Sequence, residues 1–199
     1  MLRFFVALPC LFSVVLALTA APVPKHLFPK NGPPCFPVKL GTKWVYECHT
    51  QGTVEEMTEI ITNVEDKEGF KIVTVGRFAK DDSPSPWETW AVSDQKLIRL
   101  EFFGEKHRVP LCHLKLPVET GLSWTHEDDK LRFSFTTVSV ERVKVPAGEF
   151  EAVRMQIQVN GSATSHLWYA PAIGKIKEEV AGFEYVLKSF SLGQDQNQK

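Results

Sequence analysis

The sequence has 199 residues, of which 43% are hydrophobic and 24% are charged, and its formal net charge at pH 7 is −1. A chain of this length can bury enough apolar surface for one domain with a continuous core. The near-neutral charge excludes a typical nucleic-acid-binding protein, because binding to phosphates requires clustered Lys and Arg side chains.

Residues 1–20 are typical of a signal peptide. Arg3 precedes an apolar run from Phe4 to Leu18, and small residues follow this run. We expect cleavage near Ala20, with retention as an N-terminal anchor as the alternative. Removal of residues 1–20 leaves 22 basic against 24 acidic side chains, a formal charge of −2. The sequence therefore predicts an exported protein, periplasmic or extracellular, without a stable membrane span after cleavage.

Residues 21–35 are rich in proline, which removes backbone donors and favours an extended chain, so we predict a tether. Residues 36–193 are predicted to form an antiparallel β domain. Short runs rich in β-branched and aromatic residues alternate there with turn sequences, and no window has a helical period. The runs predict about nine to ten strands in a single curved antiparallel sheet, a half-barrel or barrel. The polar residues 194–199 are predicted to be a disordered tail.

A short motif occurs twice in this domain. Residues 41–47 read Gly-x-x-Trp-x-Tyr-Glu and residues 121–127 read Gly-x-x-Trp-x-His-Glu, each after an apolar approach with Lys, Pro and an upstream Cys. The repetition predicts two similar halves, with chance similarity as the alternative. Three cysteines follow the signal, and an oxidising compartment favours one disulfide among them. The repeat places Cys35 and Cys112 at related points, which favours this pair over pairs with Cys48.

The clearest local prediction is a hairpin in the second half. Residues 153–159 alternate between apolar and polar side chains, which indicates a half-buried strand. Asn160-Gly161 favours a two-residue turn, so residues 163–169 are expected to return as the antiparallel partner. The apolar parity shifts twice between Leu131 and Val145, which predicts β-bulges that bend the sheet.

The sequence contains no motif that assigns catalysis or a cofactor. Cys48-His49 and Cys112-His113 carry potential zinc ligands, but adjacent residues of a strand point to opposite faces, so a disulfide or buried thiol is favoured over a metal site. Ser165-His166 has no nucleophile elbow around it, and no glycine-rich phosphate loop occurs. We therefore predict no catalytic residue, no metal ligand and no cofactor.

The large apolar side chains either fill a core or line a ligand cavity, as in barrels that hold one small molecule. Our candidates for lining such a cavity are Trp44, Trp90, Phe102, Trp124, Phe133, Phe135, Met155 and Trp168.

Three segments carry a resemblance to known proteins. Residues 36–46 read Phe-Pro-Val-Lys-Leu-Gly-x-x-Trp-x-Tyr, residues 145–153 read Val-Pro-Ala-Gly-x-Phe-x-Ala-Val, and residues 168–177 read Trp-Tyr-Ala-Pro-x-Ile-Gly-x-Ile-Lys. This pattern resembles a group of uncharacterised exported bacterial β-proteins, which is in turn distantly similar to the LolA and LolB lipoprotein carriers. In those carriers a bent antiparallel sheet wraps an apolar groove. The resemblance implies a lipid or lipoprotein ligand.

Three functions remain open from the sequence. The first is an exported, non-catalytic binding module that accepts a hydrophobic small molecule or lipid, such as an acyl chain, on a concave sheet. The second is a structural or protein-interaction β-domain of the cell envelope with a solid core. The third is a hydrolase whose site is assembled in space from distant residues.

Overall fold

The structure, a computed structural model, describes residues 35–78, 83–127 and 131–193. Within these ranges the chain forms one antiparallel sheet of twelve strands and no helix, in the order β6-β5-β4-β3-β2-β1-β12-β11-β10-β9-β8-β7. The predicted signal peptide (1–20), the tether up to residue 34 and the tail (194–199) lie outside the described residues.

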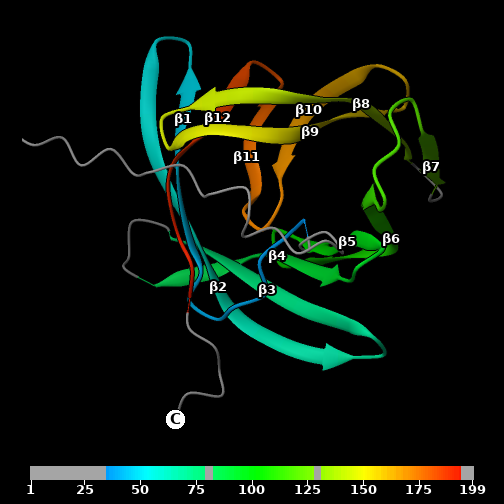
Figure 1. Cartoon of the computed structure of the whole chain (residues 1–199), viewed down its shortest axis with the longest axis horizontal. Helices are drawn as coiled ribbons and strands as arrows, with labels where there is room; N and C mark the ends of the chain where they lie inside the picture. Colours follow the sequence, from blue (N-terminus) through cyan, green and yellow to red (C-terminus); the bar gives the residue numbers. More distant parts are fainter. Residues whose placement is uncertain (1–34, 79–82, 128–130, 194–199) are drawn as a thin grey trace, which may run out of the picture.

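The sheet consists of two six-stranded meanders that meet where β1 pairs with β12. The first contains β1 (Lys43–Thr50), β2 (Thr53–Lys67), β3 (Phe70–Phe78), β4 (Pro84–Val92), β5 (Lys96–Phe102) and β6 (Glu105–Lys115). The second contains β7 (Ser123–Glu127), β8 (Arg132–Val145), β9 (Gly148–Val159), β10 (Ala163–Ala170), β11 (Gly174–Val180) and β12 (Phe183–Ser191). Both meanders curve toward each other and enclose the core as a nearly closed barrel (Figure 1).

The prediction of an antiparallel all-β domain is confirmed, but the predicted strand number was too low. The sequence signals miss β6 and β11, because both are rich in residues that are depleted in strands. Charged residues open β6 and Pro110 interrupts it, and four of the seven residues of β11 are Lys or Glu. In β11 these charges are paired, since Lys177 Nζ lies 2.9 Å from Glu179 and 2.8 Å from Glu184.

The two Gly-x-x-Trp segments form turns with the same backbone hydrogen bonds. Gly41 N–H donates to Ile61 O at 2.9 Å, and Ile61 N–H donates back to Thr42 O at 2.9 Å. In the second turn, Gly121 N–H donates to Thr137 O at 2.8 Å, and Thr137 N–H donates to Leu122 O at 3.0 Å. Both glycines have a positive φ, 78° and 87°, which a residue with a Cβ rarely adopts.

The predicted hairpin is present, with one difference in its turn. Residues of β10 from Ala163 to Tyr169 pair with β9 from Val159 back to Val153. The loop has three residues, 160–162, rather than the predicted two, because Val159 pairs with Ala163 and not with Ser162. Of the two predicted parity shifts, the first coincides with a register shift of β8 against β9 between Thr137 and Ser139.

The two edge strands of the sheet, β6 and β7, lie next to each other on the side opposite the β1–β12 pair (Figure 1). No ladder of backbone hydrogen bonds joins the described residues of these strands, and side chains of β7 bond to the backbone of β6 instead. Trp124 Nε1 donates to Cys112 O at 2.8 Å, and Cys112 N–H donates to His126 Nε2 at 3.3 Å. These contacts join the two edge strands along a junction that we call the seam. They also give the backbone N–H and carbonyl groups of Cys112, on the exposed edge of the sheet, hydrogen-bond partners.

The expected disulfide between Cys35 and Cys112 is not formed, because Cys35, Cys48 and Cys112 are all free thiols. The Cys112 thiol is engaged at the seam, where it donates to Leu114 O at 3.4 Å. Cys35 is buried in the segment before β1. Burial raises the pKa of the Cys35 thiol to about 11, so this cysteine is a protonated, unreactive group at neutral pH.

Because the two turns share the same backbone hydrogen bonds, we expect the loss of either tryptophan to reduce the stability of the fold by a similar amount. Trp44→Ala and Trp124→Ala should each lower the free energy of unfolding by about 3–5 kcal/mol, because each removes a buried indole and leaves a carbonyl without its donor. Urea unfolding measures both, with Trp87→Ala as the control, since the Trp87 ring is only half-buried and its loss should be smaller. Unchanged stability of either variant would contradict the role of these rings.

Candidate functional site

The segment Cys35–Pro37 enters the barrel before the first strand and places the ring of Phe36 inside it. This ring lies between the indoles of Trp44 from β1 and Trp90 from β4, with ring centroids 5.6 Å from each. The segment is buried, and only 6% of Phe36 is exposed. Phe36 therefore occupies a slot between two tryptophans, and we call Cys35–Pro37 the plug.

The turn between β10 and β11 forms the seat of the plug. Trp44 Nε1 donates to Ile173 O of this turn at 2.7 Å. Gly174 follows with a φ of +88°, and a Cβ placed on it would lie 3.2 Å from a ring carbon of Phe36. Both the backbone conformation and the closeness of the ring thus require glycine here.

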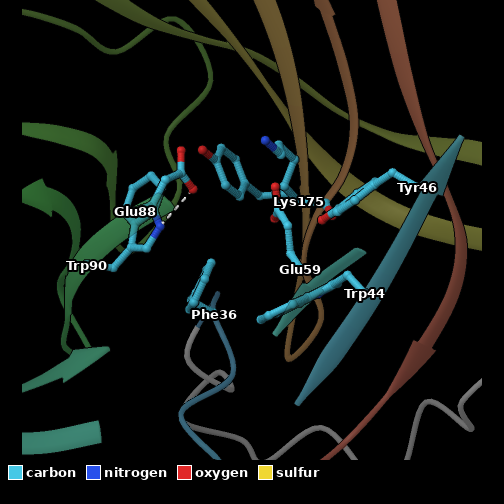
Figure 2. A pocket seen from close by; sticks show the side chains of 8 residues that line it. Phe36, Trp44, Tyr46, Glu59, Glu88, Trp90 and Lys175 are labelled. Atoms are coloured by element: carbon cyan, nitrogen blue, oxygen red, sulfur yellow. Dashed lines mark hydrogen bonds between the residues drawn. The ribbon is translucent and has the colours of Figure 1, made fainter. Parts of the chain in front are cut away.

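Charged and hydroxyl-bearing side chains lie beyond the plug. Figure 2 shows Phe36 between Trp90 and Trp44, with Glu88, Glu59 and Lys175 above its ring in this view. Glu59 (β2) and Glu88 (β4) are only 4% and 6% exposed. These three groups line one cavity of about 10 Å³ together with five aromatic residues, Phe36, Trp44, Tyr46, Trp90 and Tyr169.

Each carboxylate is held by an arginine. Arg77 Nη2 lies 2.6 Å from Glu59 Oε1, and Arg99 Nη1 lies 3.4 Å from Glu88 Oε1. Glu88 Oε2 also accepts from Trp90 Nε1 at 3.0 Å. These pairs offset part of the cost of burying charge in the barrel, a cost that a purely apolar core would not have.

Lys175 is the cation among the residues that line the cavity. Its Nζ lies 2.6 Å from Glu178 Oε2, and its backbone carbonyl accepts from the Tyr46 hydroxyl at 2.8 Å. Burial lowers the pKa of Lys175, but the carboxylates of Glu178, Glu59 and Glu88 outweigh burial and raise this pKa well above its usual range. Lys175 is therefore an ammonium group rather than a nucleophile.

The pKa values of Glu59 and of the two tyrosines are shifted by the same buried environment. Burial raises the pKa of Glu59, and the nearby Glu88 adds to this effect, while Lys175 and Arg77 oppose it. Burial also raises the pKa of Tyr46 and of Tyr169, so both hydroxyls stay protonated and can donate hydrogen bonds.

His113 of β6 lies beside this cluster, 2% exposed, with Nδ1 at 3.2 Å from the Tyr169 hydroxyl. Its ring meets Trp90 edge to face, with centroids 4.9 Å apart, and its Nε2 has no hydrogen-bond partner among the described residues. Burial lowers the pKa of His113 well below its usual value, and the positive charges of Arg99 and Lys175 lower it further. His113 is thus a neutral imidazole at physiological pH.

With the plug in place the interior is filled. A cavity of about 10 Å³ has room for about one water molecule, so it cannot hold an acyl chain unless a side chain moves. A larger depression of about 380 Å³ lies at the β11–β12 turn, but it is an open surface feature lined by residues such as Thr164, Glu179 and Gly182. The buried polar groups converge at the first cavity, which we therefore regard as the candidate site.

The structure separates the eight residues predicted to line a ligand site. Only Trp44 and Trp90 line the cavity. Trp124 and Phe135 stack on each other near the seam, with centroids 5.8 Å apart, and Met155 is fully buried in the core. The other three lie elsewhere: Phe133 packs at the margin of the core, Phe102 joins a ring cluster with Trp87 and Phe103, and Trp168 bonds to Glu141.

Sequence reasoning missed five of the eight lining residues, namely Phe36, Tyr46, Glu59, Glu88 and Lys175. A signal for the acidic pair was present, since a period of two places Glu59 on the face of Ile61 and Glu88 on the face of Trp90. A charged residue at a position where the alternation predicts an apolar one can therefore indicate a buried ionic group, and not only an irregular strand.

Neither a candidate metal site nor a candidate membrane-spanning helix is found in the described ranges. No group of three or more His, Cys, Asp or Glu side chains within them could hold a metal ion. These residues also include no helix that is long and apolar enough to cross a membrane.

No protein-family model and no curated protein matches the chain. Among the solved structures, the chain is similar in fold to the following two. One is a candidate lipoprotein from Parabacteroides distasonis, with a TM-score of 0.53 and 14% identity over 80% of this chain and 99% of the other. The second is a candidate exported protein with a YmcC-like fold from Bacteroides fragilis, with a TM-score of 0.51 and 14% identity over 78% and 98%. At this identity the likeness concerns the fold alone.

Gly174→Ala should release the plug. The new methyl group meets the Phe36 ring and sits at a positive φ, whereas Gly182→Ala adds the same methyl group at a φ of +83° with nothing within 4 Å. Urea unfolding should show a loss of stability for both variants, larger for Gly174→Ala by about 1 kcal/mol or more because overpacking adds to backbone strain. Equal losses would show that Gly174 does not support the plug.

His113 predicts a pH dependence of stability. The unfolded chain takes up a proton as the pH falls through about 6.5, while folded His113 stays neutral, so its contribution to stability is lost below that pH. Between pH 7 and 5.5 the loss from this group should be about 1 kcal/mol.

The control for this effect is His113→Gln, which should be less stable at pH 7 but lose less on acidification. Glu59, whose pKa is raised, contributes with the opposite sign, and His126 and His166 contribute with the same sign as His113. All three are present in both proteins, so the difference isolates His113. Parallel losses in the two proteins would contradict the assignment.

Proposed function

We propose that the chain is an exported, non-catalytic binding domain of the cell envelope that accepts a hydrophobic ligand in the slot of Phe36. The observation that carries this proposal is the plug, an aromatic ring held between Trp44 and Trp90 by a segment that belongs to no strand. Its displacement breaks no strand ladder, so the slot can open while the sheet stays intact.

A ligand in this slot would replace Phe36 between the two indoles and would lie above the polar groups of the cavity. Aromatic walls with a few convergent polar groups are the usual composition of sites for small molecules. The export signal supports a location in the envelope or outside the cell, and so does the shared fold with a candidate lipoprotein and a candidate exported protein.

Several observations favour binding over hydrolysis. The potential nucleophiles near the cavity are protonated, since Lys175 is an ammonium and the pKa of Cys35 is about 11. His113 is fully buried and outside the cavity lining, so it cannot reach a substrate there. Glu59 and Glu88 are each engaged by an arginine rather than placed beside a nucleophile.

The second candidate function is a structural or protein-interaction domain of the envelope. The small volume of the cavity, about 10 Å³, favours this function, because a permanently filled barrel needs no ligand. The two functions differ in one property, which is whether Phe36 gives way to an external hydrophobic molecule.

Removal of the plug tests this difference. Phe36→Ala should bind the neutral fluorescent probe N-phenyl-1-naphthylamine about tenfold or more tightly than the parent, because the probe no longer competes with an internal ring. Fluorescence titration measures the affinity, and near-UV circular dichroism verifies that the variant is folded. Phe183→Ala, which removes an exposed ring at the β11–β12 turn, should bind like the parent.

A second variant tests whether the probe binds in the slot itself. Trp90→Ala in the Phe36→Ala background should weaken probe binding, because it removes one aromatic wall. Equal, weak binding by the parent and a folded Phe36→Ala would contradict the binding function and favour the solid envelope domain.

A further inference from the structure

We propose, on the basis of the ligand site assigned above, that the slot of Phe36 selects ligands with a positively charged head, an organic amine or quaternary ammonium, over neutral and anionic ligands of the same shape. The geometry behind this selection has two parts, which are a set of aromatic faces and a pair of buried carboxylates.

The aromatic part consists of four rings from three strands. Trp44 and Tyr46 come from β1, Trp90 from β4 and Tyr169 from β10, and all four line the cavity together with Phe36. The faces of such rings attract cations, most strongly when the cation is removed from water. One cation already uses this property, since Lys175 Nζ lies 5.9 Å from the centroid of the Tyr46 ring.

The carboxylates Glu59 and Glu88 are the second part. Both line the cavity from different strands, and both are more than nine-tenths buried. Arg77 and Arg99 pair with them but are not among the lining residues. The wall that a ligand touches therefore carries two carboxylates and one ammonium group.

Lys175 shows how the carboxylates act on one positive charge at the cavity wall. Burial alone would lower its pKa, yet the neighbouring carboxylates raise it well above the usual range. A positive charge is thus stabilised at this position in spite of desolvation. An ammonium head placed between Glu59 and Glu88 would be attracted by these two carboxylates, but not by Glu178, which makes the largest of the three contributions at Lys175.

The same charges exclude an anionic head. A carboxylate or phosphate in the slot would be buried beside Glu59 and Glu88, and its approach to Lys175 would compete with Glu178, whose oxygen is 2.6 Å from the lysine Nζ. Like charges at short range in a poorly solvated site repel strongly. Among hydrophobic ligands, free fatty acids are therefore disfavoured and apolar amines are favoured.

Small aromatic probes test charge selection in the vacated slot. Toluene, benzyl alcohol, benzylammonium and benzoate have similar ring-sized bodies and differ in the head. Isothermal titration of Phe36→Ala should show benzylammonium binding about tenfold or more tightly than benzyl alcohol, and benzoate binding most weakly. Glu88→Gln in this background keeps an acceptor for Trp90 and removes the charge, so it should reduce the preference for benzylammonium several-fold.

The outcomes separate the two proposals. Binding of toluene and benzyl alcohol without a preference for benzylammonium would overturn charge selection and leave the binding function standing. Failure of every probe to bind folded Phe36→Ala would overturn both.

The parent chain supplies a measurement that does not depend on the variant. Dodecylammonium should displace N-phenyl-1-naphthylamine from the parent at a concentration at least several-fold lower than dodecanoate does, both below their micellar concentrations. Equal or reversed potencies would overturn charge selection even if Phe36→Ala does not fold.

Discussion

The indole of Trp44 connects the parts of the molecule on which the site depends. Its N–H donates to Ile173 O in the β10–β11 turn, which links β1 to the second meander, and one side of its ring packs against Phe36. Phe190 of β12 lies near the same indole, with ring centroids 6.0 Å apart. Trp44 therefore contacts the plug, the turn that seats it and a strand on the other side of the joint between the meanders.

A barrel that encloses charged groups has an unusual balance of energies. Pairing with Arg77 and Arg99 stabilises Glu59 and Glu88, but desolvation of such pairs generally cancels much of this gain. An apolar set of side chains would fill the same space at lower cost. The ionic groups next to the Phe36 ring therefore add little stability, and the recognition of a ligand that we propose would give them a role.

The sequence predicted the features that local backbone chemistry determines. Alternation over residues 153–159 and the turn at Asn160 specified the hairpin, and the glycines at 41 and 121 specified the repeated turns. It did not predict features that depend on distant partners. The Pro-rich approach predicted a tether through residue 35, although Cys35 is buried, and the sequence did not predict Lys175 as a cavity residue, because only the packing of distant strands brings it there. The sequence also did not predict strand β6, because Pro110 gives this segment a poor strand propensity. Pairing with β5 overrides that propensity in the folded protein.

Native mass spectrometry of the full chain, recovered from its own export compartment, would show whether the barrel carries a bound ligand. The account predicts a reproducible extra mass that organic solvent removes and that fragments as an apolar amine. A bare chain under every gentle condition would contradict a ligand-binding barrel and would support a solid domain whose function lies on its surface.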